Sequence, residues 1–237
     1  MNVFWIAAAS VVGLPAGTVL RGQVARLSVP GGEPDEQTCR TCAAPLPFGP
    51  ALECDHCGTP IGAALAIELL TAAVLGLLMF RLGPHPATAA FAYMAVVGVA
   101  LAQVDTAVRR LPDRLTLPAY PALIILLALA AAATGTWSAF GRALLAGLVL
   151  AAVYAALGLI SRGQLGGGDI KLAGLLGLLL GWLSWGAVLA GAGLGFVLAA
   201  GAGIVLLARR QASLRTMVSF GPYMLAGALM AAVAGLR

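Results

Sequence analysis

Apolar stretches of about 20 residues recur along the whole chain, and this recurrence limits the possible fold more than any other feature. As α-helices, stretches of this length match the hydrocarbon core of a bilayer, which is about 30 Å thick. They lack the alternation of apolar and polar residues that is typical of a membrane β-barrel. Charged residues make up only 10% of the chain, against about 25% in soluble domains. The sequence therefore predicts an all-α polytopic membrane protein.

The apolar stretches divide the chain into about eight expected transmembrane helices. The sixth is the shortest, so one long bent helix in place of the sixth and seventh, giving seven spans, is an alternative. No Lys or Arg precedes the first stretch, as a secretory signal would require, so we interpret it as a retained span. The expected spans are residues 3–20, 61–80, 87–104, 117–133, 140–160, 172–183, 186–208 and 218–236.

The Lys and Arg residues are divided unevenly between the two sides of the membrane that eight spans define. Eleven lie on one side, and only Arg81, Arg142 and Arg237 lie on the other. Basic residues concentrate on the cytoplasmic side, so the sequence predicts that both termini lie outside and that residues 21–60 form a cytosolic loop. Because the basic residues follow the sidedness of a membrane protein, the net charge of +5 does not indicate binding to nucleic acid. We expect the lipid bilayer as a partner instead.

All four cysteines lie in this loop as two C-x-x-C pairs, Cys39 with Cys42 and Cys54 with Cys57. Disulfides do not persist in a reducing cytosol, whereas four thiolates match the tetrahedral site of a structural Zn²⁺ ion. Because cysteine fills all four positions, such an ion has no open position for a substrate. A redox dithiol or unligated thiols are the alternative. Gly58 follows the second pair, where a tight turn would need glycine.

Two carboxylates interrupt apolar sequence at the ends of expected spans. Asp105 ends the third span, and Asp169 opens the sixth, directly after the glycine run 166–168. An ionisable residue at this depth indicates a functional site when a partner can be named, and each Asp is the other's candidate partner. The glycines leave the backbone bare, so that an extended peptide can approach closely. Helix capping, or ion pairs with the nearby Arg109 and Lys171, is the alternative.

Two carboxylates that face one water molecule can together hydrolyse a peptide bond. One, as the anion, takes a proton from water, while the other, still protonated, polarises the scissile carbonyl group. No serine or H-E-x-x-H motif competes with this pair, since the only histidines, His56 and His85, fall on opposite sides in this topology.

Two other polar positions occur inside or beside expected spans. Glu68 lies within the second span, where an unpaired carboxylate is costly. Contact with the interface, a hydrogen bond within the bundle, or a place in the active cavity would each satisfy it. Residues 219–223 open the last span, and Pro222 is ordinary near a helix start, so we assign this segment no function.

The order of these residues along nearly the whole chain resembles the type IV prepilin leader peptidases. The most specific match is G-x-G-D, and the matching residues are the two cysteine pairs, Glu68, Asp105 with Leu111-Pro112-Asp113, Gly166-Gly167-Gly168-Asp169 with Lys171, and Phe220-Gly221-Pro222. The resemblance implies an intramembrane aspartic endopeptidase with Asp105 and Asp169 as its catalytic pair. It implies that the site is supported by Glu68, Gly166, Gly167, Gly168, Lys171 and Asp113.

This resemblance also implies a substrate and a location. Prepilins or pseudopilins would be cut after a glycine at the cytoplasmic face of the bacterial inner membrane. We expect residues 1–20 to form the first span, 21–60 the cysteine loop and 61–237 the peptidase core. Many members also N-methylate the new N-terminus with S-adenosylmethionine, an activity linked to the first cytosolic loop. Only 11 residues separate the cysteine pairs, and this short loop argues against methylation here.

Three other protein classes share some of these features. The presenilin and signal-peptide-peptidase group also uses G-x-G-D, but places Tyr before the first Asp, where this chain has Val104. A transporter or channel could use the Asp pair as a cation site, although no convincing internal repeat supports it. A zinc-bearing scaffold without chemistry would explain the cysteines but not the glycine run.

Overall fold

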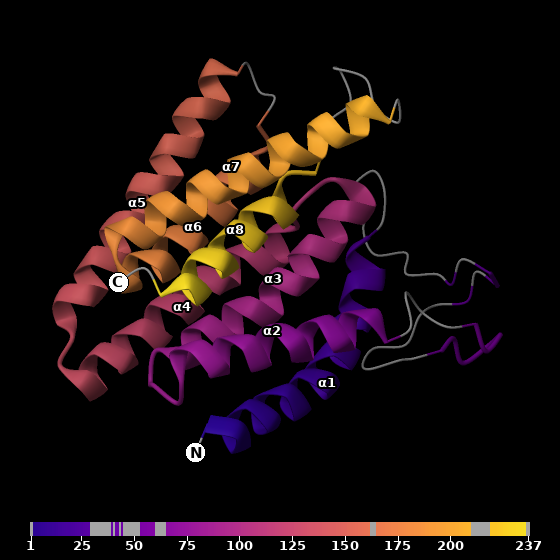
Figure 1. Cartoon of the computed structure of the whole chain (residues 1–237). Coiled ribbons are helices and arrows are strands. Elements are labelled where there is room, and N and C mark those ends of the chain that lie inside the picture. The colour runs from indigo at the N-terminus through magenta and orange to yellow at the C-terminus, as the bar shows by residue number, and fades with distance from the viewer. Residues whose placement is uncertain are drawn as a thin grey trace.

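Eight helices form the fold in the part of the chain that the structure describes (Figure 1). The structure is a computed structural model, and it describes residues 2–28, 39, 41–42, 44, 53–59, 65–161, 165–209 and 219–235. The helices occupy the eight segments predicted to span the membrane, which confirms the all-α prediction. They are α1 (Asn2–Leu27), α2 (Ala66–Leu82), α3 (Thr88–Val108), α4 (Asp113–Thr134), α5 (Trp137–Ile160), α6 (Gly167–Leu183), α7 (Trp185–Ala208) and α8 (Gly221–Ala234).

The lengths of the helices divide them into two groups. α1, α3, α4, α5 and α7 are long and apolar enough to cross a bilayer, so the chain is a multi-pass membrane protein. α2, α6 and α8 have 17, 17 and 14 residues, which corresponds to helices of about 26, 26 and 21 Å. α6 and α7 are separate helices, because Ser184 between them is extended and accepts a hydrogen bond from the Ala187 N–H. The alternative of one long bent helix is therefore wrong.

α1 continues to Leu27, beyond its predicted end at residue 20. Arg21, where we expected the cytosolic loop to begin, lies buried against α2 and forms an ion pair with Glu68. Pairing of the two charges offsets part of the cost of removing each from water. The helix can therefore extend through a basic residue that would otherwise mark its end.

α6 lies at the centre of the bundle, where every residue from Leu172 to Trp182 is buried. Glycines allow this helix to approach α5 closely. A Cβ atom on Gly177 would lie 2.6 Å from the carbonyl oxygen of Ala146, and one on Gly181 would lie 2.5 Å from the Ala146 Cβ. Small residues at such interfaces drive helix association in lipid by letting backbones pack together.

This packing makes Gly177→Ala destabilising, although alanine is normally favoured over glycine in a helix by about 0.5–1 kcal/mol. The added methyl group meets backbone atoms of α5 that cannot rotate away, so we expect a loss of about 1–3 kcal/mol. Gly193→Ala on α7 is the matched control, because no atom lies within 4 Å of its added Cβ. Thermal unfolding in detergent should show a lower Tm for Gly177→Ala only. Equal shifts for both variants would contradict the close α5–α6 contact.

Two arginines bind the carboxyl ends of α6 and α8. Arg142 of α5 donates hydrogen bonds to the carbonyl oxygens of Gly181, Trp182 and Leu183, at 2.7, 2.8 and 3.1 Å. Arg81 of α2 donates to the carbonyl oxygen of Val233 on α8 at 2.5 Å. A cation is favourable at a helix carboxyl end, where carbonyl groups lack partners. These contacts fix the positions of α6 and α8 along the bundle, and hence of the functional groups at their opposite ends.

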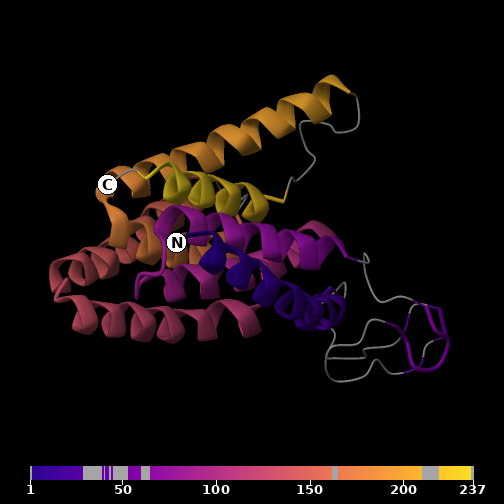
Figure 2. The ribbon, with the colours of Figure 1, turned by 60° about the horizontal axis from the view of Figure 1, so that its bottom comes forward.

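The described cysteine-bearing residues lie apart from the bundle. Figures 1 and 2 show them beyond the end where α1 finishes and α2 begins, whereas the two chain ends lie toward the opposite end. The cysteine segment is thus attached to the bundle through α1 and α2.

Candidate functional site

Asp105 lies in the last turn of α3, 4% exposed, against the amino end of α8. Ser219 donates a short hydrogen bond from its hydroxyl group to Oδ2 of Asp105, and the backbone N–H of Gly221 donates to the same oxygen at 3.1 Å. The positive end of the α8 dipole reinforces both bonds. Among the described residues Asp105 makes no ion pair with Arg109, so that alternative is wrong.

Gly221 fits this position because a side chain there would collide with the acid. A Cβ atom on Gly221 would lie 2.8 Å from Oδ2 of Asp105. Phe220, the residue between the two donors, packs against Tyr154 of α5 and Phe196 of α7, with ring centroids 6.3 and 5.1 Å away. This aromatic cluster anchors the start of α8, so that the two donors face the carboxylate of Asp105.

Asp169 lies partly buried in the first turn of α6, which begins at Gly167 instead of residue 172. Its backbone N–H donates to the carbonyl oxygen of Gly166 at 3.0 Å. Asp169 lies close enough to Asp105 for their two carboxylates to repel each other. It also lies close enough to Tyr154 for its charge to act on the phenol group. The structure therefore brings together two acids that lie on separate helices.

Leu111 provides the packing that holds this arrangement. A Cβ atom on Gly168 would lie 2.8 Å from the Cβ of Leu111, and one on Gly221 would lie 3.6 Å from its Cδ2. The residue before Asp169 and the residue that binds Asp105 thus touch the same side chain. Gly166 and Gly167 are exposed, and the open backbone expected beside Asp169 is found there.

Asp113 and Lys171 form an ion pair with each other, with a distance of 2.5 Å between Nζ and Oδ1. The two side chains are 57% and 37% exposed, so the pair contributes at most about 1 kcal/mol to stability. Tyr120 of α4 donates a hydrogen bond to the carbonyl oxygen of Lys171 at 2.7 Å. These contacts join the start of α4 to α6. The alternative that Lys171 pairs with Asp169 is therefore wrong.

Glu68, 2% exposed, is not brought to the two aspartates. It forms the buried ion pair with Arg21, and Gly17 of α1 packs against its backbone. Among the described residues no hydrogen bond or ion pair joins Glu68 to Asp105 or Asp169. An ion pair, and not the expected hydrogen bond, thus satisfies Glu68 within the bundle and links α1 to α2.

The four cysteines form a cluster in which every sulfur lies within 4.8 Å of the others. Cys39 and Cys57 sulfurs are 3.6 Å apart, as are those of Cys42 and Cys54. Tetrahedral Zn²⁺ with bonds of about 2.3 Å places its sulfur ligands about 3.8 Å apart, so the cluster fits this ion. All four cysteines are free thiols, and each lies too far from the others for a disulfide.

The backbone of the cysteine segment repeats one turn. The N–H of Cys39 donates to the carbonyl oxygen of Ala44 at 2.7 Å, and that of Cys54 donates to Thr59 at 2.9 Å. Gly58 has a φ of +66°, which confirms that the second turn needs glycine. A hydrogen bond from the Thr59 hydroxyl group lowers the pKa of the Cys39 thiol to about 5, whereas burial and the other three sulfurs raise the pKa of the Cys42 thiol to about 12.

Sequence reasoning missed three residues of this site: Ser219, Gly221 and Tyr154. Gly221 was visible only as part of a motif shared with a family, and Pro222 beside it had an ordinary explanation as a helix start. Ser219 carried no separate signal. Tyr154 lies within an unbroken apolar stretch, and only the packing of α5 against α6 gives it a role.

Comparisons with known proteins show which family the sequence matches. The sequence profile of the type IV leader peptidase family matches residues 91–236. A protein of Burkholderia pseudomallei named prepilin leader peptidase/N-methyltransferase is 31% identical over 185 residues, which cover 73% of this chain and 56% of the relative. An Aeromonas hydrophila protein of the same name is 33% identical over 177 residues, covering 72% of this chain and 58% of the relative. The chain thus spans little more than half the length of these relatives. No solved structure matches it.

Proposed function

This chain belongs to the type IV leader peptidase family, and from that premise we propose that it is a prepilin peptidase. It removes the leader of type IV prepilins or pseudopilins after a glycine, as an aspartic endopeptidase. The observation that carries this proposal is the approach of Asp105 and Asp169 at the ends of α3 and α6. Mass spectrometry of a prepilin-like peptide incubated with the purified protein tests it: a single cut after the glycine is expected, and an intact peptide would contradict it.

The contacts of the two acids support different roles for them. Asp105 accepts two hydrogen bonds on Oδ2, which hold its carboxylate in place, and we assign it the role of the base. Asp169 has a partly exposed side chain beside bare backbone and acts, protonated, as the acid that donates to the scissile carbonyl oxygen. Asp105 takes a proton from water as the water oxygen bonds to the carbonyl carbon and Asp169 gives its proton to the carbonyl oxygen. The C–N bond of the tetrahedral intermediate then breaks, the amine leaves with the proton from Asp105, and one hydroxyl group of the intermediate returns a proton to Asp169 as the new carboxyl group forms.

The same contacts disfavour the rival cation site. Oδ2 of Asp105 already accepts hydrogen bonds from Ser219 and Gly221, which occupy both of its lone pairs, so Asp105 would offer a cation only its Oδ1. A cation would also be repelled by the amino end of α8. We therefore favour hydrolysis over transport.

Ser219→Ala should lower kcat by about tenfold to a hundredfold, the effect of losing one hydrogen bond to a charged group. KM should stay unchanged, because Ser219 holds Asp105 and does not line the path of the peptide in this mechanism. Ser219→Thr keeps the hydroxyl group and should restore most of the lost rate. Steady-state kinetics on all three proteins provide the measurement. A kcat that is unaffected in Ser219→Ala, or a Thr variant as slow as the Ala variant, would contradict the role of the hydroxyl group.

We further propose that the four cysteines bind one structural Zn²⁺ ion in a cytosolic loop between the end of α1 at Leu27 and the start of α2 at Ala66. The ion would cross-link the two turns that follow Cys39 and Cys54, and it supplies no catalytic chemistry because cysteine fills every position. In this proposal Asp105 and Asp169 of the peptidase core, residues 61–237, lie at the cytoplasmic face of the bacterial inner membrane, and both termini lie outside. The relatives' names include N-methyltransferase, but our proposal for this chain covers the peptidase alone.

A further inference from the structure

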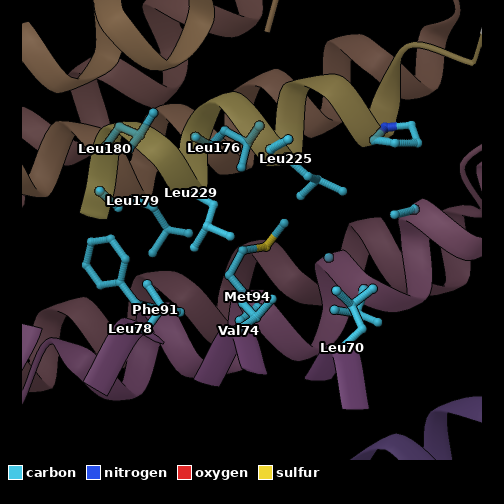
Figure 3. Close-up of a pocket in the computed structure, with 18 of the residues that line it drawn as sticks. Leu70, Val74, Leu78, Phe91, Met94, Leu176, Leu179, Leu180, Leu225 and Leu229 are labelled. Carbon is cyan, nitrogen blue, oxygen red and sulfur yellow. The ribbon is translucent and has the colours of Figure 1, made fainter. Parts of the chain in front are cut away.

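A groove of about 380 Å³ runs between α2 and α3 on one side and α6 and α8 on the other. Its walls are almost entirely apolar (Figure 3). α2 and α3 contribute the lower wall in this view and α8 the upper wall. The labelled residues that face one another across it include Leu70, Val74, Phe91, Met94, Leu225 and Leu229.

One end of this groove reaches the candidate active site. Gln103 and Thr106, which flank Asp105 on α3, line it there, as does Pro222, which follows Gly221. Phe91 lines the other end, so the groove follows α3 for about 22 Å. Arg81 joins α2 to α8 at that far end. At the near end the hydrogen bonds of Ser219 and Gly221 to Asp105 join α8 to α3, so the groove ends beside the acids.

We propose that this groove binds an apolar, membrane-embedded helix of the peptide that the two acids cut. The inference rests on the proposed peptidase function and adds a binding surface to it. A peptide bond within a helix is not accessible to water, so the residues at the acids must be unwound. The groove lets the adjoining residues remain helical and apolar while the unwound part lies at Asp105.

The lining residues suit a helix as the occupant. Ala95 and Ala102 lie on the same face of α3, and Ala226 faces the groove from α8. Small side chains at these positions let another helix approach closely, as in helix pairs in membranes. Since a helix is about 10–12 Å wide, the groove receives the side chains of one helix face and leaves the other face in lipid.

Ala95→Phe tests the proposal, because it fills the groove about 15 Å along α3 from Asp105. Two peptides are compared: one with the leader, the cleavage site and an apolar segment of about 20 residues, and one truncated shortly after the cleavage site. The wild-type protein should show a KM about tenfold lower for the long peptide. Ala95→Phe should remove this advantage by raising the KM for the long peptide only, with kcat and the truncated peptide unaffected. Val74→Phe on the opposite wall should behave in the same way.

Ala200→Phe on α7 is the control, since it places the same side chain on an exposed position outside the groove. It should leave both peptides unaffected. Equal effects of Ala95→Phe on both peptides, or none on either, would overturn the groove proposal. So would a photo-crosslinker at position 95 that captures lipid but never the long peptide. If the wild-type protein cuts both peptides equally well, the peptidase stands and the groove fails; if it cuts neither, both proposals fail.

Discussion

Asp105→Asn and Asp169→Asn should each lower kcat for a prepilin-like peptide by about a hundredfold or more, and by up to about ten-thousandfold. Asparagine keeps the size of the side chain but can neither accept a proton from water as the anion nor donate one as the acid. The double variant should be no slower than the slower single variant, because the two acids act on one water molecule as a unit. Cleavage by purified protein in detergent, quantified by mass spectrometry, provides the rates.

Two controls separate loss of chemistry from loss of fold. Glu53→Gln removes a carboxylate from an exposed position outside the site and should leave kcat unchanged. Size-exclusion profiles and Tm values of the aspartate variants should match those of the wild-type protein. Cleavage that persists at the wild-type rate in either aspartate variant would refute the mechanism.

Cys39→Ser should abolish stoichiometric zinc binding, whereas the wild-type protein should carry about one Zn²⁺ per chain. Binding of a structural zinc ion supplies about 10–16 kcal/mol in small domains, and a hydroxyl group is a far poorer ligand than a thiolate, so the loss should be nearly complete. The peptidase rate should change much less than the metal content, because the cysteine cluster lies beyond the end of the bundle. Elemental analysis by mass spectrometry after gel filtration gives the ratio of zinc to protein.

His56→Ala is the matched control for the zinc prediction. His56 lies between Cys54 and Cys57 and is exposed, and it does not belong to the cluster of four sulfurs. Its replacement should leave the metal content unchanged. Zinc-free wild-type protein, with four thiols that react freely with a thiol reagent, would instead favour the redox or unligated alternative.

The sequence predicted the features that depend on local patterns. The length of each apolar stretch predicts a helix, because the bilayer requires every backbone group to be satisfied within the segment. The spacing of Cys39, Cys42, Cys54 and Cys57 predicts their clustering, since two short turns bring each pair together. Asp105 and Asp169 each lie at a helix end. The sequence indicates this position because apolar residues lie on one side of each aspartate and polar residues or glycines on the other.

The contacts that the sequence could not predict join helices far apart in the chain. Ser219 reaches Asp105 only because α8 packs against α3, and nothing near Ser219 in the sequence indicates that packing. Lys171 lies two residues from Asp169, yet it pairs with Asp113 because Lys171 and Asp169 project from different faces of α6. The sequence left three environments open for Glu68: the membrane interface, the bundle and the active cavity. Its partner in the structure, Arg21, was expected in a loop. Such choices depend on helix packing and not on local pattern.

A structure of the protein with a bound peptide, in which a hydroxyl-bearing tetrahedral group replaces the scissile amide, tests the central claim most directly. The hydroxyl oxygen represents the attacking water. We predict that it lies within hydrogen-bond reach of both acids, at about 2.6–3.2 Å from a carboxylate oxygen of Asp105 and from one of Asp169. A hydroxyl group that contacts only one of these carboxylates, or an inhibitor bound away from the ends of α3 and α6, would contradict the shared-water mechanism.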